Sequence, residues 1–202
     1  MLARQKMRGF SMVELLIVVA ILMIVIGTSF IQIIPALRAA KTEVALQTTL
    51  GQMRRAHEMA VDKRTVYRLS FNAPRTIQLD QVDINPLNAA KIFTFQSSID
   101  LPPEMSFVVI SGIPTSASTV PEGYGNGSTA IDFNRDYGGG GTEVYFQRDG
   151  RALNAANQLN NGLVYMCRTG GEFRSCKAVS LMGATGRSKG WRLNPAANGW
   201  IQ

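Results

Sequence analysis

Arg8-Gly9-Phe10-Ser11-Met12-Val13-Glu14 is the stretch that decides the fold, because it opens a run from Leu15 to Leu37 without Asp, Glu, Lys or Arg. An α-helix rises about 1.5 Å per residue, so this run is long enough to cross a hydrocarbon core of about 30 Å. We therefore expect residues 10–37 to form a single-pass transmembrane helix. Three basic residues and no acidic residue precede it, which predicts a cytoplasmic N-terminus and an exported chain after Leu37.

Two other interpretations of this stretch stay open. In the first, Leu15 to Ile26 is the apolar region of a secretory signal peptide, which a conventional signal peptidase removes near Gly27-Thr28-Ser29. The apolar run continues past that point through Ile34, and an acidic residue at its start is unusual, which argues against this interpretation. In the second, the stretch is a plain membrane anchor in which Glu14 has no role.

Glu14 places a carboxylate at the mouth of an apolar helix, where it needs a partner. At the centre of a membrane a carboxylate costs about 2.5–3.5 kcal/mol on insertion scales, and less near the edge. The pattern of Gly9-Phe10, three residues and Glu14, after a short basic leader, resembles the class III signal of type IV pilins and type II secretion pseudopilins.

This resemblance implies a processing pathway and a place in an assembly. A prepilin peptidase would cleave between Gly9 and Phe10, removing residues 1–9, and the new Phe10 amine would be N-methylated. The mature chain would sit in the bacterial inner membrane with its C-terminal domain in the periplasm, and would join other pilins or pseudopilins in a filament. Glu14 would pair with the Phe10 ammonium of a neighbouring subunit, since a mis-registered subunit leaves both charges unpaired.

Beyond Pro35 the apolar pattern becomes amphipathic, which predicts that the helix continues over residues 38–63 and buries one stripe against a domain. Pro35 removes a backbone donor and Gly27 lowers helix propensity, so we expect a bend or a locally weak stretch between them. The members of the predicted stripe are Leu46, Leu50, Met53, His57 and either Ala60 or Val61.

After the helix the hydrophobic period changes from 3.6 to 2, which predicts β-strands separated by connectors rich in Gly, Ser, Pro and Asn. We expect one long N-terminal helix, half transmembrane and half amphipathic, packed on an antiparallel sheet: an α+β fold with a β-rich domain over residues 64–202. The predicted strands are Thr65–Phe71, Thr76–Val82, Lys91–Gln96, Met105–Ile110, Thr129–Phe133, Glu143–Gln147, Gly162–Cys167, Lys177–Met182 and Gly190–Leu193.

Cys167 and Cys176 are the two cysteines of the chain and flank the predicted hairpin tip Thr169-Gly170-Gly171-Glu172. In an exported domain, this pair predicts a disulfide that closes a small loop. A metal site is the alternative, but the single histidine, His57, lies far away in the sequence and leaves no set of four ligands. We therefore expect no metal centre.

No catalytic constellation is present in the sequence, so we expect neither enzymatic activity nor a cofactor. His57 lies on an apolar stripe, where a packed side chain is commoner than a catalytic base, and no Gly-x-Ser-x-Gly elbow occurs. The stretch from Gly183 to Lys189 lacks the spacing of a phosphate-binding loop.

Positive charge is concentrated at the C-terminal end: residues 148–202 contain 8 basic and 2 acidic residues. Phe146-Gln147-Arg148-Asp149-Gly150, the strand from Gly162, and the segment from Ala178 through Gly186-Arg187-Ser188-Lys189 to Trp191-Arg192-Leu193 resemble the ending of the GspH/FimT family of minor pseudopilins and minor pilins. In that family a penultimate strand runs into a Gly-Arg turn and a short final strand.

The family resemblance leads to two hypotheses about function. The first is a minor pilin or pseudopilin, a structural and assembly subunit of a type IV pilus or a type II secretion pseudopilus. The second is a DNA-binding minor pilin, because some fimbrial members bind DNA through a Gly-Arg-x-Arg motif. Here Lys189 replaces the second arginine and loses its bidentate fork, although Arg187, Lys189 and Arg192 could still contact phosphates.

Overall fold

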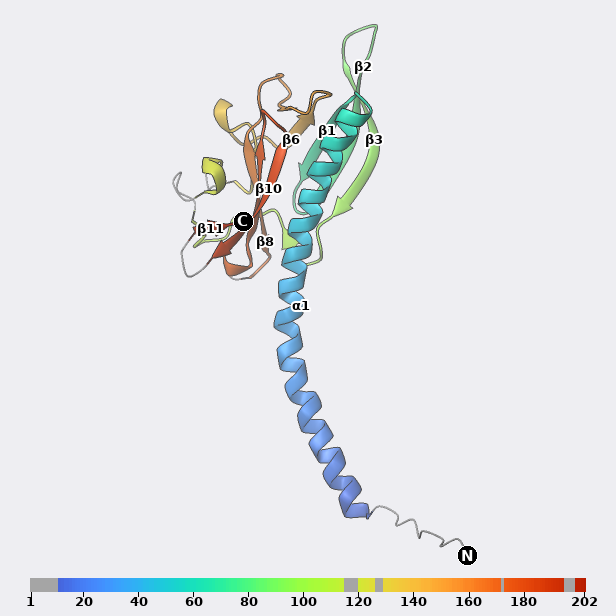
Figure 1. Cartoon of the computed structure of the whole chain (residues 1–202), viewed down its shortest axis with the longest axis vertical. Coiled ribbons are helices and arrows are strands. Elements are labelled where there is room, and N and C mark those ends of the chain that lie inside the picture. Colours follow the sequence, from blue (N-terminus) through green and yellow to red (C-terminus); the bar gives the residue numbers. More distant parts are fainter. Residues whose placement is uncertain (1–10, 115–119, 126–128, 172, 195–198) are drawn as a thin grey trace, which may run out of the picture. The chain divides into compact units, whose positions relative to one another are not determined.

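The computed structural model describes residues 11–114, 120–125, 129–171, 173–194 and 199–202, apart from the side chains of residues 28 and 30–32 (Figure 1). The chain divides into two compact units, one ending at Ala39 and the other running from Ala40 to Gln202. The predicted α+β class is confirmed, because one long helix precedes a series of antiparallel strands.

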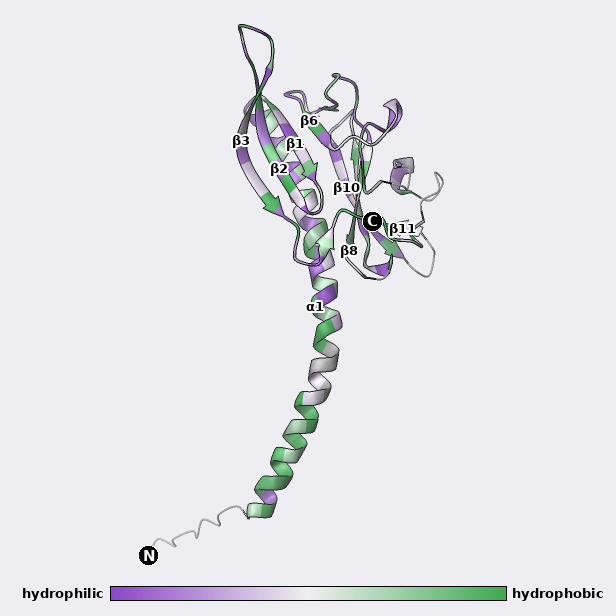
Figure 2. Cartoon of the chain, turned by 180° about the vertical axis from the view of Figure 1, so that it is seen from behind, coloured by the Kyte–Doolittle hydropathy of each residue, from purple (hydrophilic) through white to green (hydrophobic). Residues whose placement is uncertain are grey.

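Helix α1 runs without interruption from Met12 to Asp62, with Pro35 inside it. The expected weak stretch between Gly27 and Pro35 therefore does not end the helix. In the first unit most side chains of α1 are apolar and exposed, for example Met12 at 89% and Leu16 at 66% exposure. Figure 2 shows this end of the helix as strongly hydrophobic. Among the described residues, no helix reaches the length and hydropathy of a membrane-spanning segment.

In the second unit α1 buries the predicted stripe. Leu46, Leu50, Met53 and Ala60 are each at most 5% exposed, whereas Val61 is 43% exposed, so Ala60 is the member that faces the core. His57 is half-buried. Small residues lie between the large ones on the same face, which lets the helix approach the sheets closely; they are Thr42, Ala45, Thr49 and Ala56.

The first sheet has the order β3-β2-β1-β6-β7, and every pairing in it is antiparallel. Its strands are β1 (Val66–Asn72), β2 (Thr76–Ile84), β3 (Lys91–Asp100), β6 (Glu143–Phe146) and β7 (Ala152–Leu153). Tyr67, Leu69 and Phe71 of β1 are buried in the same core cluster as the α1 stripe, as strand alternation requires. Arg68 points to the opposite face, where it pairs with Asp80 and Glu143.

The second sheet has the order β11-β10-β9-β8-β4, with β5 also pairing with β8. Its strands are β4 (Met105–Ser106), β5 (Ile131–Asp132), β8 (Gly162–Arg168), β9 (Lys177–Met182), β10 (Arg187–Asn194) and β11 (Gly199–Ile201). Strand β8 is buried on both faces: Val164 and Met166 join the main core, while Leu163 and Tyr165 belong to a second cluster with Trp191 and Trp200.

Several predicted strands differ from the observed ones. The strand predicted over Met105–Ile110 pairs only at Met105–Ser106, because Val108 to Ile110 pack on the second cluster as a loop instead of joining a ladder. The strand predicted over Thr129–Phe133 is Ile131–Asp132, and the short strands β7 and β11 were not predicted. Strand β10 begins at Arg187 rather than Gly190, so the predicted Gly-Arg turn ends at Gly186.

Gly186 stands where a side chain cannot be accommodated. Its φ is +63°, and a Cβ there would overlap the carbonyl oxygen of Gly150 and lie 2.5 Å from Cδ2 of His57. The turn before β10 thus packs directly on α1 and on the turn after β6. Gly170, at the tip of the β8–β9 hairpin, has nearly the same φ of +68° but nothing within 4 Å of its would-be Cβ.

We expect Gly186→Ala to destabilise the protein by about 2–4 kcal/mol, because it combines left-handed backbone strain with a clash against rigid backbone. Gly170→Ala is the matched control and should cost only about 1 kcal/mol, since it carries the strain without the clash. Urea unfolding followed by circular dichroism measures both free energies. Equal losses in the two variants would contradict the packing role assigned to Gly186.

Candidate functional site

Glu14 lies in the first turn of α1, and the backbone amide of Leu15 already donates to the Ser11 carbonyl at 3.1 Å. A carboxylate in the first turn interacts favourably with the helix dipole. The side chains around it, including Met12, Val13 and Leu16, are apolar and exposed. Glu14 takes part in no ion pair recorded within the described segments. Gly9 and Phe10, the predicted cleavage and methylation residues, lie outside the described residues.

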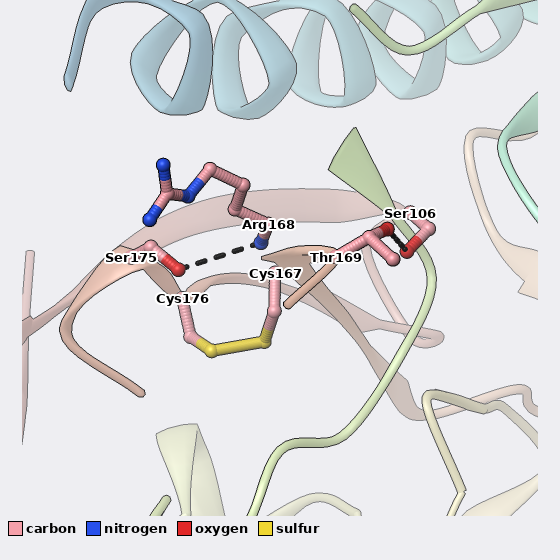
Figure 3. Close-up of a disulfide and its surroundings, with 6 residues drawn as sticks. All are labelled: Ser106, Cys167, Arg168, Thr169, Ser175 and Cys176. Carbon is pink, nitrogen blue, oxygen red and sulfur yellow. Dashed lines mark hydrogen bonds between the residues drawn. A yellow bond between two sulfur atoms is a disulfide. The ribbon is translucent and has the colours of Figure 1, made fainter. Parts of the chain in front are cut away.

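Cys167 and Cys176 form the predicted disulfide, which joins the end of β8 to the residue before β9 (Figure 3). It follows directly on the last ladder pair, Met166 with Lys177, so it extends the pairing of the two strands by one step. On each side of it a further contact secures the hairpin. The Arg168 amide donates to Ser175 Oγ at 3.4 Å, and the Ser106 and Thr169 hydroxyls lie 2.9 Å apart.

The carboxylate of Glu122 is the centre of a polar cluster on the second sheet. Its Oε1 pairs with Lys189 Nζ at 2.9 Å and with an Arg187 guanidinium nitrogen at 3.2 Å. Its Oε2 accepts a hydrogen bond from Ser180 Oγ at 2.7 Å, and Ser180 Oγ in turn accepts from Trp191 Nε1 at 2.9 Å. Glu122 follows the buried Pro121 and has a left-handed φ of 54°. One loop carboxylate thus satisfies two of the three predicted DNA-binding residues.

Burial works against the charge of Glu122, yet the pKa of its carboxyl lies below the ordinary value of 4.5. Hydrogen bonds from Ser180 and Lys189, with the charges of Lys189 and Arg187, outweigh the desolvation. The ionised form is therefore the one that the folded chain stabilises.

The third predicted DNA-binding residue, Arg192, pairs with Glu43 of α1. Its Nε donates to Glu43 Oε2 at 3.1 Å, and a second guanidinium nitrogen contacts Oε1. The hydrogen bond from Arg192 holds the pKa of the Glu43 carboxyl below 4.5, although burial opposes this shift. This fork joins β10 to the helix across 149 positions of sequence.

The structure therefore brings Arg187 and Lys189 together and places Arg192 elsewhere, on the helix side. All three cations are paired with carboxylates of the same chain, Glu122 or Glu43. DNA binding stays a prediction. Those two carboxylates were missed in the sequence because they lie far from the tail. One feature of the sequence could have indicated them. Acidic residues outnumber basic residues between positions 10 and 147, so carboxylates from that part are available to pair with the basic tail. Within the described ranges, no group of three His, Cys, Asp or Glu residues could hold a metal ion.

Glu122→Gln should lower stability at neutral pH by about 1–3 kcal/mol, since it removes the charge from a partly buried carboxylate that two cations and a hydroxyl contact. Because the folded-state pKa of Glu122 is lowered, its contribution is present above about pH 4.5 and is lost as the pH falls through the folded value. The variant should therefore lose less stability on acidification than the unaltered chain.

Thermal unfolding between about pH 3 and pH 7 tests this expectation. The matched control is Glu104→Gln, which removes a carboxylate that is 49% exposed and pairs with Lys41. Such an exposed pair should contribute only about 0–1 kcal/mol. The same loss and the same pH profile in both variants would refute the special role of Glu122.

Comparison with known protein families agrees with the N-terminal pattern. Residues 4–30 match the prokaryotic N-terminal methylation motif. Among solved structures, the type IV minor pilin FimU of Pseudomonas aeruginosa is similar at 11% identity and a TM-score of 0.45, over 81% of this chain and 94% of that chain. No curated protein sequence matches the chain. The chain thus combines a prokaryotic N-terminal methylation motif with one long helix ahead of antiparallel sheets.

Proposed function

We propose that this chain is a minor pilin or pseudopilin, a structural and assembly subunit of a type IV pilus or a type II secretion pseudopilus. The observation that carries the proposal is the methylation motif at residues 4–30, which runs directly into α1. The apolar side chains of the first unit are exposed along this helix. Exposed apolar surface of this extent requires a membrane or other helices to cover it.

In this proposal the stretch over residues 10–37 inserts in the bacterial inner membrane and later packs among the helices of other subunits. Glu14 then sets the register. Among apolar helices its carboxylate is satisfied when the Phe10 ammonium of a neighbouring subunit lies beside it, and a shifted subunit leaves both charges unpaired. The methylated amine keeps its charge, so methylation is compatible with this pairing.

The remaining part of the proposal concerns processing and compartment. A prepilin peptidase cleaves between Gly9 and Phe10 and removes the basic leader on the cytoplasmic side. Residues 64–202 lie in the periplasm, where the disulfide between Cys167 and Cys176 is favoured by the oxidising conditions. Closing a loop of this length stabilises the folded domain by about 2–3 kcal/mol.

Glu14→Gln should abolish or strongly reduce incorporation into filaments, because it removes the charge but keeps the size of the side chain. Filaments sheared from cells and probed for this subunit measure incorporation, and membrane fractions measure the amount of chain available. The matched control is Glu58→Gln, which removes an exposed carboxylate from the part of α1 that belongs to the second unit. Normal incorporation of the Glu14→Gln chain would contradict the register role.

Gly9→Val should leave residues 1–9 attached and Phe10 unmethylated, since a β-branched residue at the scissile bond obstructs the peptidase. Mass spectrometry of the purified chain gives both the N-terminus and the presence of the methyl group. The unaltered chain is expected to begin at methylated Phe10. A mature N-terminus near Gly27-Thr28-Ser29 would instead establish the signal-peptide interpretation and refute the proposed function.

A further inference from the structure

A cavity of about 400 Å³ opens at the end of the first sheet, where the chain leaves α1. Four segments distant in sequence form its walls: the start of β1 after the helix, the β2–β3 hairpin, the end of β6, and Asn157 between β7 and β8. Small-ligand sites in proteins have volumes of this order. The cavity belongs entirely to the second unit and shares no lining residue with the Glu122 cluster.

Three cations line this cavity, namely Arg64, Lys91 and Arg148. None of them belongs to an ion pair recorded for the described residues, in contrast to Arg187, Lys189 and Arg192. Lys91 is partly held, since its Nζ donates to the Ala155 carbonyl at 3.1 Å. The lining contains a single carboxylate, that of Asp83, so the cavity has an excess of positive charge that the chain itself does not neutralise.

Apolar side chains line the cavity beside these cations. Val66, Val82 and Ile84 line the cavity together with Tyr145. Lys91 Nζ lies 4.5 Å from the centre of the Tyr145 ring, a cation–π contact. Burial raises the pKa of Tyr145 to about 12, so the phenol stays neutral, and its hydroxyl donates to Glu143. The site thus combines three apolar side chains, Val66, Val82 and Ile84, with three cations. We call the first set the apolar floor and the second set, Arg64, Lys91 and Arg148, the cationic rim.

The cationic rim is held by ordered backbone. Arg64 adopts a left-handed φ of 51° at the exit from α1, Lys91 is the first residue of β3, and Arg148 follows β6 by two positions. Lys91 pairs directly with Ile84 across the hairpin, which fixes a cation beside an apolar side chain. This placement reduces the entropy that a ligand would otherwise lose in ordering the site.

We propose that this cavity binds a peptide segment of a partner subunit that carries a carboxylate next to an apolar side chain. Charge complementarity selects the carboxylate, and the floor of Val66, Val82 and Ile84 selects the apolar neighbour. A nucleic acid fits less well, because its phosphates would use the cations but have no apolar group to place against Val66, Val82 and Ile84. The identity of the partner as another subunit rests on the proposed function, whereas the binding chemistry does not.

The probe for the binding chemistry is N-acetyl-leucine, which has one carboxylate beside one apolar side chain. Its titration into the full chain in detergent micelles, followed by amide NMR, should shift resonances of Val66, Val82 and Lys91. N-acetyl-leucinamide, which lacks the charge, and inorganic phosphate, which lacks the apolar group, should bind much more weakly. Absence of shifts, or equal binding of phosphate or of the amide, would overturn the proposal.

Arg64→Gln with Arg148→Gln should weaken N-acetyl-leucine binding by roughly tenfold or more, since each cation supplies a charge-assisted hydrogen bond. The matched control is Arg55→Gln with Arg174→Gln, two exposed cations outside the cavity, which changes the net charge equally. Equal weakening in both double variants would assign the effect to net charge and overturn the site. Retained NMR dispersion shows that each variant folds.

A second arm tests the partner. A photo-crosslinking residue in place of Gln147, which lines the cavity and has no assigned contact with the peptide, should capture a subunit peptide with Asp, Glu or a terminal carboxylate beside an apolar residue. Crosslinking to peptides without that chemistry would overturn the proposed occupant. The titration result does not depend on filament assembly, so absence of the unaltered chain from filaments would reject the proposed function and leave the binding chemistry of the cavity standing.

Discussion

Burial of one stripe of α1 against both sheets is the interaction on which the rest of the domain depends. Leu46, Leu50 and Met53 occupy the same core cluster as β1 and β2 of the first sheet and β8 and β9 of the second. A fully buried side chain of this size contributes about 1.5–3 kcal/mol. Each sheet alone would expose an apolar face, so neither is expected to persist without the helix.

Carboxylates, rather than cations, organise the C-terminal strands. Glu43 joins α1 to β10 through Arg192, and Glu122 fixes a loop over β9 and β10 through Ser180, Arg187 and Lys189. Four of the eight basic residues from position 148 onward are therefore paired with carboxylates within the fold: Arg151, Arg187, Lys189 and Arg192. Cations outside any ion pair recorded in the described part of the chain lie at the end of the first sheet, where Arg64, Lys91 and Arg148 line a cavity. The lining of that cavity contains one carboxylate, that of Asp83, against these three cations.

Local patterns predicted the helix, most strands and the disulfide, because each depends on residues close together in the sequence. The alternation in Thr76–Val82 and the stripe of α1 are of this kind. Strands β7 and β11, with two and three residues, have too few positions to show a period, and their pairing depends on distant partners. The Glu122 cluster was beyond reach for the same reason: its members come from positions 122, 180, 187 and 189, and only the folded sheet brings them together.

Glu14 and Glu122 show how the same side chain acquires different roles from its surroundings. Glu122 obtains two cations and a hydroxyl from its own chain, so a single folded molecule satisfies it. Glu14 lies among exposed apolar side chains on a helix whose described neighbours offer it no cation. If lipid or other helices cover those side chains, as we propose, the carboxylate loses its water and needs a charge that the described residues of its own chain do not supply. In the proposed assembly, covering the apolar surface and pairing Glu14 are therefore one requirement, which subunits in a fixed register would meet together.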